Sequence, residues 1–60
     1  SLGGQAAAAA HSLGTPLSTI LLTVKELQKE FGNEHKISKD LNLLVSQSNR
    51  CREILKKLRL

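Results

Sequence analysis

Small or apolar side chains recur along this chain at spacings that alternate between four and three, in two stretches separated by a short polar break. The first stripe is Ala6, Ala10, Leu13, Leu17, Ile20, Val24, Leu27 and Phe31, and the second is Ile37, Leu41, Leu44, Ser48, Cys51, Leu55 and Leu58. This spacing is the a/d pattern of helices that pack side by side in a bundle. It predicts one helix over about residues 5–31 and a second over about residues 37–60.

The break between the two stripes predicts a turn over about residues 32–36. Gly32 is expected to end the first helix, because glycine is the usual residue for the left-handed turn past a helix end. Asn33 or Ser38 could cap the second helix. A connection this short favours antiparallel neighbours. The predicted fold is therefore all-α, an antiparallel helical hairpin with no domain boundary inside residues 1–60.

A hairpin of this size buries too little surface to be stable as a monomer. Its sixty residues include one phenylalanine and neither tyrosine nor tryptophan, so the core must be built from small aliphatic side chains. Further apolar positions widen both stripes, namely Leu21, Leu43, Val45 and Ile54. We therefore expect two copies of the hairpin to pair as a homodimer and form a four-helix bundle.

The formal charge of +4 matters mainly through its placement. Five cations crowd the end of the chain, namely Arg50, Arg52, Lys56, Lys57 and Arg59. A charge run of this kind is ordinarily a solvated helix face, and nucleic-acid binding is disfavoured because no aromatic residues are interleaved with the cations. No apolar run approaches the about 20 residues that span a bilayer, and no signal peptide is recognisable. The single cysteine, Cys51, excludes a disulfide within the chain.

A histidine stands within the strongest helix-forming segment. Five alanines precede His11, and Pro16 follows five residues later. Pro16 has no N–H to donate to the carbonyl of Ser12, so it is expected to kink the helix, and Gly14 weakens the same turn. The heptad frame places His11 on the flank of the seam, facing solvent or a groove. His35, near the predicted turn, has none of this context and is expected to be a surface residue.

The combination of His11, Leu13, Thr15, Pro16 and Leu17 resembles the H-box of sensor histidine kinases, and the flanks over residues 3–20 are similar to the redox-responsive RegB/PrrB subfamily. The resemblance implies that His11 is the phosphoacceptor, which attacks the γ-phosphate of ATP and later passes the phosphoryl group to an aspartate of a response regulator. It also implies that Thr15 can position a water that hydrolyses the regulator's phospho-aspartate. By geometry alone, an exposed threonine tolerated beside a kink is an equal alternative.

The same resemblance implies the setting and the partners. The chain would be the dimerisation and histidine-phosphotransfer domain of a histidine kinase, on the cytoplasmic side of a bacterial protein anchored in the inner membrane. ATP with magnesium would be bound by a separate ATP-binding domain, so no cofactor or metal is expected on this chain. The partners would be a second copy, that ATP-binding domain and the receiver domain of a response regulator. The alternative is a purely structural dimerising hairpin without chemistry.

One position departs from the family pattern. The family usually places glutamate or aspartate directly after the histidine, where the carboxylate orients the imidazole and takes its proton, whereas this chain has Ser12. A serine hydroxyl is not a base at physiological pH. Three interpretations stay open: slower phosphorylation of His11, a base elsewhere, or an engineered change.

The second helix contributes two further site predictions. The run over residues 46–55 resembles the RegB/PrrB segment with the redox cysteine, which implies that Cys51 oxidises reversibly and turns the kinase down; its flanking arginines favour the thiolate. A lone cysteine on an apolar stripe is otherwise a small buried hydrophobe. Antiparallel pairing would place Arg52, Lys56 and Lys57 opposite residues 12–16, where cations offset phosphoryl charge and attract a regulator's acidic pocket.

Overall fold

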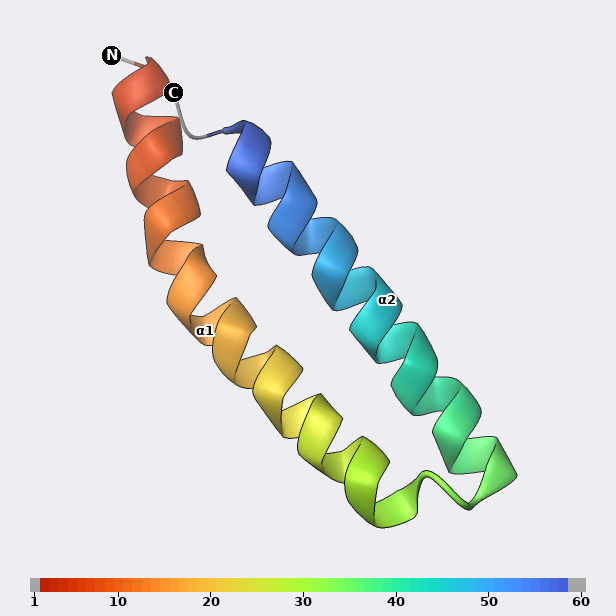
Figure 1. Cartoon of the computed structure of the whole chain (residues 1–60). Coiled ribbons are helices and arrows are strands. Elements are labelled where there is room, and N and C mark those ends of the chain that lie inside the picture. The colour runs from red at the N-terminus through yellow and green to blue at the C-terminus, as the bar shows by residue number, and fades with distance from the viewer. Residues whose placement is uncertain (1, 59–60) are drawn as a thin grey trace.

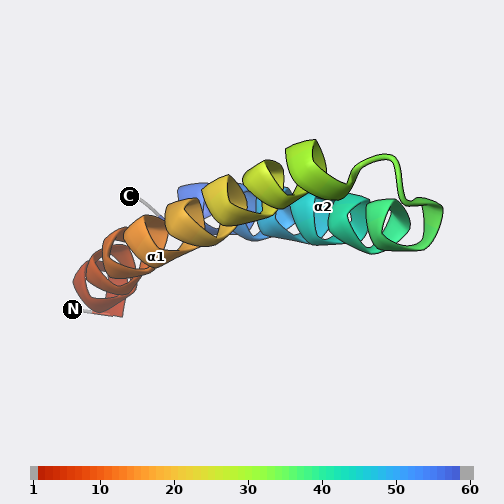
Figure 2. The same ribbon diagram turned by 90° about the horizontal axis from the view of Figure 1, so that it is seen from below.

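The computed structural model describes residues 2–58, and their side chains from residue 4 onward. Helix α1 (Leu2–Phe31) and helix α2 (His35–Lys57) lie side by side and antiparallel, joined by a three-residue turn, and the described part of the chain contains no strand (Figures 1 and 2). The start of α1 and the end of α2 consequently lie at the same end of the hairpin, far from the turn (Figure 1). The predicted all-α helical hairpin is confirmed.

The helix ends differ from the predicted bounds by a few residues. Helix α1 begins at Leu2 rather than near Gln5, because the alanine run that follows is a strong enough helix former to carry the glycines at 3 and 4. Helix α2 begins at His35, with Glu34 as its N-cap; the Glu34 carbonyl accepts from the Ser38 N–H at 2.8 Å, and no side chain caps this end. Helix α2 ends at Lys57, and Ser1, Arg59 and Leu60 lie outside the described residues.

The turn uses Gly32 differently from the prediction. No glycine among the described residues has a positive φ, so the left-handed conformation expected at Gly32 is wrong. The glycine is needed for a different reason, since a Cβ at this position would lie 2.5 Å from the carbonyl oxygen of Gln28. The chain leaves α1 through a close backbone approach that only a residue without a side chain permits.

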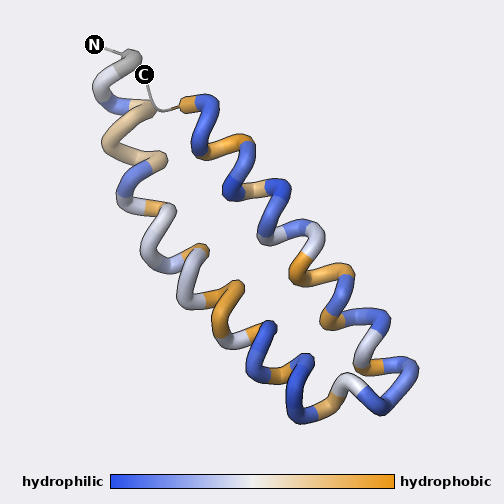
Figure 3. Tube along the Cα trace, in the orientation of Figure 1, coloured by the Kyte–Doolittle hydropathy of each residue, from blue (hydrophilic) through white to orange (hydrophobic). Residues whose placement is uncertain are grey.

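Packing between α1 and α2 uses one half of each predicted seam. Ala10 and Val24 of α1 are buried with the neighbouring Leu21, and Leu41 and Ser48 of α2 are buried against them. Apolar positions recur along both helices (Figure 3). The other half of each seam is exposed in the single chain. We call it the outer apolar face, and its exposed members are Leu13, Ile20, Leu27, Ile37, Leu44, Cys51 and Leu58.

A hydrogen bond between two side chains joins the helices near the turn. Gln28 Nε2 donates to Asn42 Oδ1 at 2.8 Å, which joins α1 to α2. The ion pairs of Lys29 with Glu26 and of Lys56 with Glu53 each lie within one exposed helix surface, where such pairs contribute little to stability. Apolar packing and the turn therefore hold most of the hairpin.

Helix α1 is unusually apolar for a surface helix. Among the described residues, the segment Gly4–Phe31 is long and apolar enough, by length and composition alone, to cross a membrane, with a mean hydropathy of 1.2. The sequence predicted no such segment. The hydropathy comes from the alanine run and from the two halves of the apolar stripe, one of which packs on α2. A core helix of a soluble protein passes the same test of length and composition.

Candidate functional site

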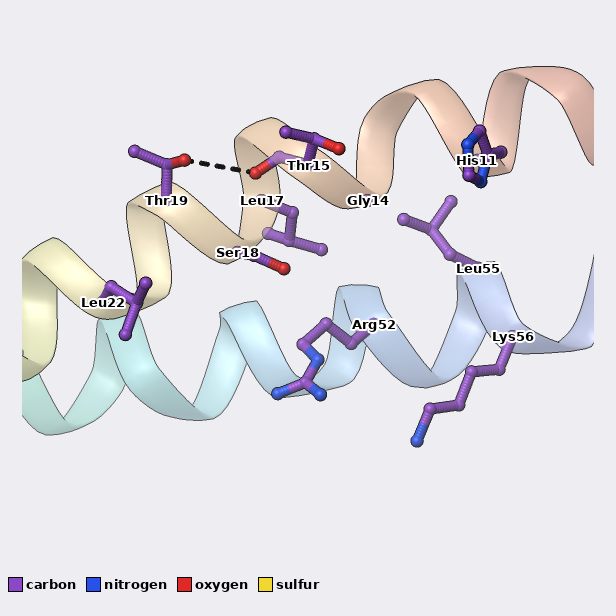
Figure 4. Close-up of a pocket in the computed structure, with 10 residues that line it drawn as sticks. All are labelled: His11, Gly14, Thr15, Leu17, Ser18, Thr19, Leu22, Arg52, Leu55 and Lys56. Atoms are coloured by element: carbon purple, nitrogen blue, oxygen red, sulfur yellow. Dashed lines mark hydrogen bonds between the residues drawn. The ribbon is translucent and has the colours of Figure 1, made fainter.

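His11 lies at the edge of a groove between the two helices. It follows Ala10, which is 1% exposed and packs against α2, so the next side chain along is turned outward and is exposed. The groove has a volume of about 420 Å³, and Figure 4 shows the residues that line it: His11, Gly14, Thr15, Leu17, Ser18, Thr19, Leu22, Arg52, Leu55 and Lys56. The prediction placed His11 toward solvent or a groove, and the structure places it at both.

The two walls of the groove have different chemistry. Leu17 and Leu55 lie between the helices, whereas the ends of Arg52 and Lys56 are directed away from α1 (Figure 4). Lys56 Nζ pairs with Glu53 Oε1 at 3.1 Å. Two of the three predicted cations thus share the groove with His11, while Lys57 does not line it. Neither cation of the groove is directed at the imidazole, so the two positive charges are available to an anionic group that approaches the groove from solvent.

The residues around the predicted kink divide between the groove and the solvent. Thr15 and Gly14 line the groove with His11, while Ser12 and Pro16 are exposed and do not. Pro16 lies inside α1, which continues through it as one helix. Because Ser12 does not line the groove, a longer side chain would be needed there to reach around to the imidazole.

Cys51 belongs to a second groove, on the outer apolar face. This groove has a volume of about 340 Å³, and its other lining residues are all apolar: Leu13, Pro16, Leu17, Ile20, Ile54 and Leu55. Leu17 of α1 and Cys51 of α2 thus lie at the same level of the hairpin. Its predicted burial is not seen in the single chain, where the thiol is free and exposed, because its half of the seam faces away from α1.

Sequence reasoning missed three members of the His11 groove. Ser18, Thr19 and Leu22 line it, at seven, eight and eleven positions after His11. These intervals return to about the same helix face, so the periodicity that found Thr15 would have found them as well. Among residues 2–58, no three His, Cys, Asp or Glu side chains are grouped so that they could hold a metal ion.

The family model described as the His Kinase A (phospho-acceptor) domain matches residues 1–60. The chain belongs to this family. This His Kinase A domain is also 47% identical to the sensor histidine kinase RegB of Cereibacter sphaeroides over 57 residues, which cover 95% of the chain and 12% of the relative. A second RegB sequence from Cereibacter sphaeroides is 46% identical over the same shares of the two proteins. The predicted RegB-like resemblance is confirmed, and no solved structure matches.

The His Kinase A domain spans only about an eighth of the curated relatives that it matches. The family description names a phospho-acceptor, which directs attention to the nucleophilic side chains of the groove. His11 offers an imidazole, and Thr15, Ser18 and Thr19 offer hydroxyls. Imidazole is the stronger nucleophile of the two near neutral pH, because the hydroxyls need a base to activate them.

Proposed function

We propose that His11 is the residue that becomes phosphorylated in a two-component sensor histidine kinase. A separate catalytic domain holds ATP with its magnesium ion, and an imidazole nitrogen of His11 attacks the γ-phosphorus while ADP leaves. The phosphoryl group then passes to an aspartate of a response regulator. The observation that carries the proposal is the exposed His11 at the rim of a groove, in a chain whose family is defined by a phospho-acceptor.

The groove also supports the proposed regulator contact. Arg52 and Lys56 present cations on the far wall, and an acidic phosphorylation pocket would be attracted to them. Lys57, outside the groove, adds to the same field. Thr15 shares the groove with His11, so its hydroxyl is available to orient a water on the regulator's phospho-aspartate.

The outer apolar face supports the proposed homodimer. Leu13 and Ile20 are 53% and 52% exposed, yet they belong to the same heptad frame as the buried positions. A second copy of the hairpin covers such a face most simply, giving a four-helix bundle. In this proposal, the parent protein carries the bundle on the cytoplasmic side of an inner-membrane anchor.

The test is phosphorylation of the chain in trans. The catalytic domain of a RegB relative, labelled ATP and magnesium are mixed with the chain, and the site is mapped by mass spectrometry. We expect a label that is lost in acid and kept in alkali, located on His11. An acid-stable label on a hydroxyl, or no label with a catalytic domain that phosphorylates its own hairpin, would favour the alternative of a structural hairpin without chemistry.

Ser12 offers a prediction about the rate. Ser12→Glu is expected to raise the rate of His11 phosphorylation by about tenfold, on the scale of a positioned general base. The carboxylate would sit beside the nucleophile and take its proton. Initial rates with labelled ATP decide the matter, and Ser12→Gln is the matched control because it has the same reach without the basic group. Equal rates for the two variants would mean that the base lies elsewhere or is not needed.

Cys51 offers a prediction about redox control, which we also propose. A mild disulfide-forming oxidant is expected to give a covalent dimer on a non-reducing gel and to lower the rate of His11 phosphorylation, both reversed by added thiol. A direct bond within the dimer requires Cα atoms within about 7 Å of each other. Cys51→Ala should abolish both effects and leave phosphorylation intact. A Cys51→Ala protein that is as oxidant-sensitive as the parent would reduce Cys51 to a packing residue.

A further inference from the structure

Three threonines follow one another at intervals of four along the exposed side of α1: Thr15, Thr19 and Thr23. Two of them turn their hydroxyls back onto the helix. Thr19 Oγ1 donates to the carbonyl oxygen of Thr15 at 3.2 Å, and Thr23 Oγ1 donates to that of Thr19 at 2.8 Å (Figure 4 shows the first). Each of these carbonyls also lies where the N–H four residues ahead would bond it, so each serves two donors.

Pro16 disturbs the same side of the helix in the opposite sense. It leaves the carbonyl of Ser12 without an N–H donor four residues ahead. An interior carbonyl of an α-helix ordinarily accepts one hydrogen bond, from the N–H four residues ahead. Within this one stretch, the Ser12 carbonyl lacks that bond, whereas the carbonyls of Thr15 and Thr19 each accept an additional bond from a hydroxyl. Pro16 and the three residues that carry these carbonyls are all exposed.

The disturbed side is the convex side of the helix. Thr19 and Thr23 each stand two positions from the buried Leu21, which is about 200° around the helix, so both lie on the side of α1 opposite Leu21, where Thr19 still borders the groove. Helices curve convex to solvent where outer carbonyls tilt outward, and hydroxyls bonded to the carbonyl four residues back add to the bend. Figure 1 shows α1 bowed in this way, with its convex side away from α2.

We propose that Thr19 and Thr23 are positioning residues, which extend the bend begun at Pro16 by about two turns and so set how the His11 end of α1 lies against α2. His11 stands at the N-terminal edge of this segment, and the groove beside it is bounded by both helices. The curvature of α1 therefore decides the width of the groove and the direction in which the imidazole is presented. The effect on the rate of His11 phosphorylation rests on the proposed function, whereas the effect on the curvature of α1 does not.

The test replaces both hydroxyls by methyl groups. Thr19→Val with Thr23→Val keeps the branched shape and a similar helix propensity but removes both side-chain hydrogen bonds. Residual dipolar couplings of the α1 amides, measured in the chain itself, report the angle between the segments before and after this region. We expect a straighter helix, unchanged or higher thermal stability, and a rate of His11 phosphorylation at saturating catalytic domain lowered by at least about threefold.

The matched control keeps the hydroxyls. Thr19→Ser with Thr23→Ser should retain both the bend and the rate, because serine bonds the same carbonyls. Thr23→Val alone serves as a second variant, since Thr23 does not line the groove and cannot act by direct contact there. An unchanged angle in the valine protein, or the same loss in the serine protein, overturns the proposal. If the wild-type chain bends but accepts no phosphate, the proposed function fails and the bending role stands.

Discussion

Replacing His11 by glutamine is expected to abolish phosphorylation of the chain by a supplied catalytic domain. Glutamine keeps a polar group of similar reach at the rim of the groove but has no nucleophilic nitrogen, so no acid-labile bond to phosphorus can form. The substitution is at an exposed helix position and makes no demand on packing. The loss of label should therefore be complete while the helical content and thermal stability remain those of the parent.

The matched control is the other histidine. His35 is exposed at the first position of α2, beside the turn and outside the groove. His35→Gln is expected to retain the full label, measured with labelled ATP and quantified on gels run without acid fixation. If the His11→Gln protein keeps an acid-labile label and the His35→Gln protein loses it, the phosphoacceptor has been assigned to the wrong end of the hairpin.

Much of the His11 groove could be predicted because helical periodicity and an antiparallel turn are both visible in the sequence. Four positions after His11 is the next turn of the same face, and folding the chain back at the turn brings the end of α2 beside it. Thr15, Arg52 and Lys56 follow from this geometry alone. Lys57, one position further along α2, is turned out of the groove, which a count of cations could not show.

Other features depend on how the helices rotate against each other. The heptad pattern put Cys51 on a seam but could not say whether α1 or a second copy covers it; within the chain it is exposed. The hydrogen bond between Gln28 and Asn42 likewise needs the helix rotation to be known. At Gly32 the residue type was informative, but its missing Cβ rather than its freedom at positive φ is what the turn uses.

Two neighbouring leucines on α2 test the proposed dimer, because both are exposed in the single chain but lie on different faces. Leu44 is 48% exposed and belongs to the outer apolar face, while Leu43 is 59% exposed and is a flanking position, one residue away from the a/d positions of the second stripe. If exposure alone decided which leucine lies in the dimer interface, it would be Leu43. The heptad pattern instead predicts that Leu44 lies in the interface.

Leu44→Glu is therefore expected to dissociate the dimer, and Leu43→Glu to leave it intact. Each copy would lose about 1 kcal/mol of apolar burial at Leu44, and a carboxylate held in the interface costs several kcal/mol more. Since the two-fold symmetry counts the change twice, the total exceeds about 4 kcal/mol, which raises the dimer Kd by at least about a thousandfold. Sedimentation equilibrium over micromolar concentrations measures this for both variants. The two substitutions add the same charge to adjacent helix positions, so equal behaviour of the two proteins, or a wild-type chain that is a well-folded monomer, would show that the outer apolar face does not pair.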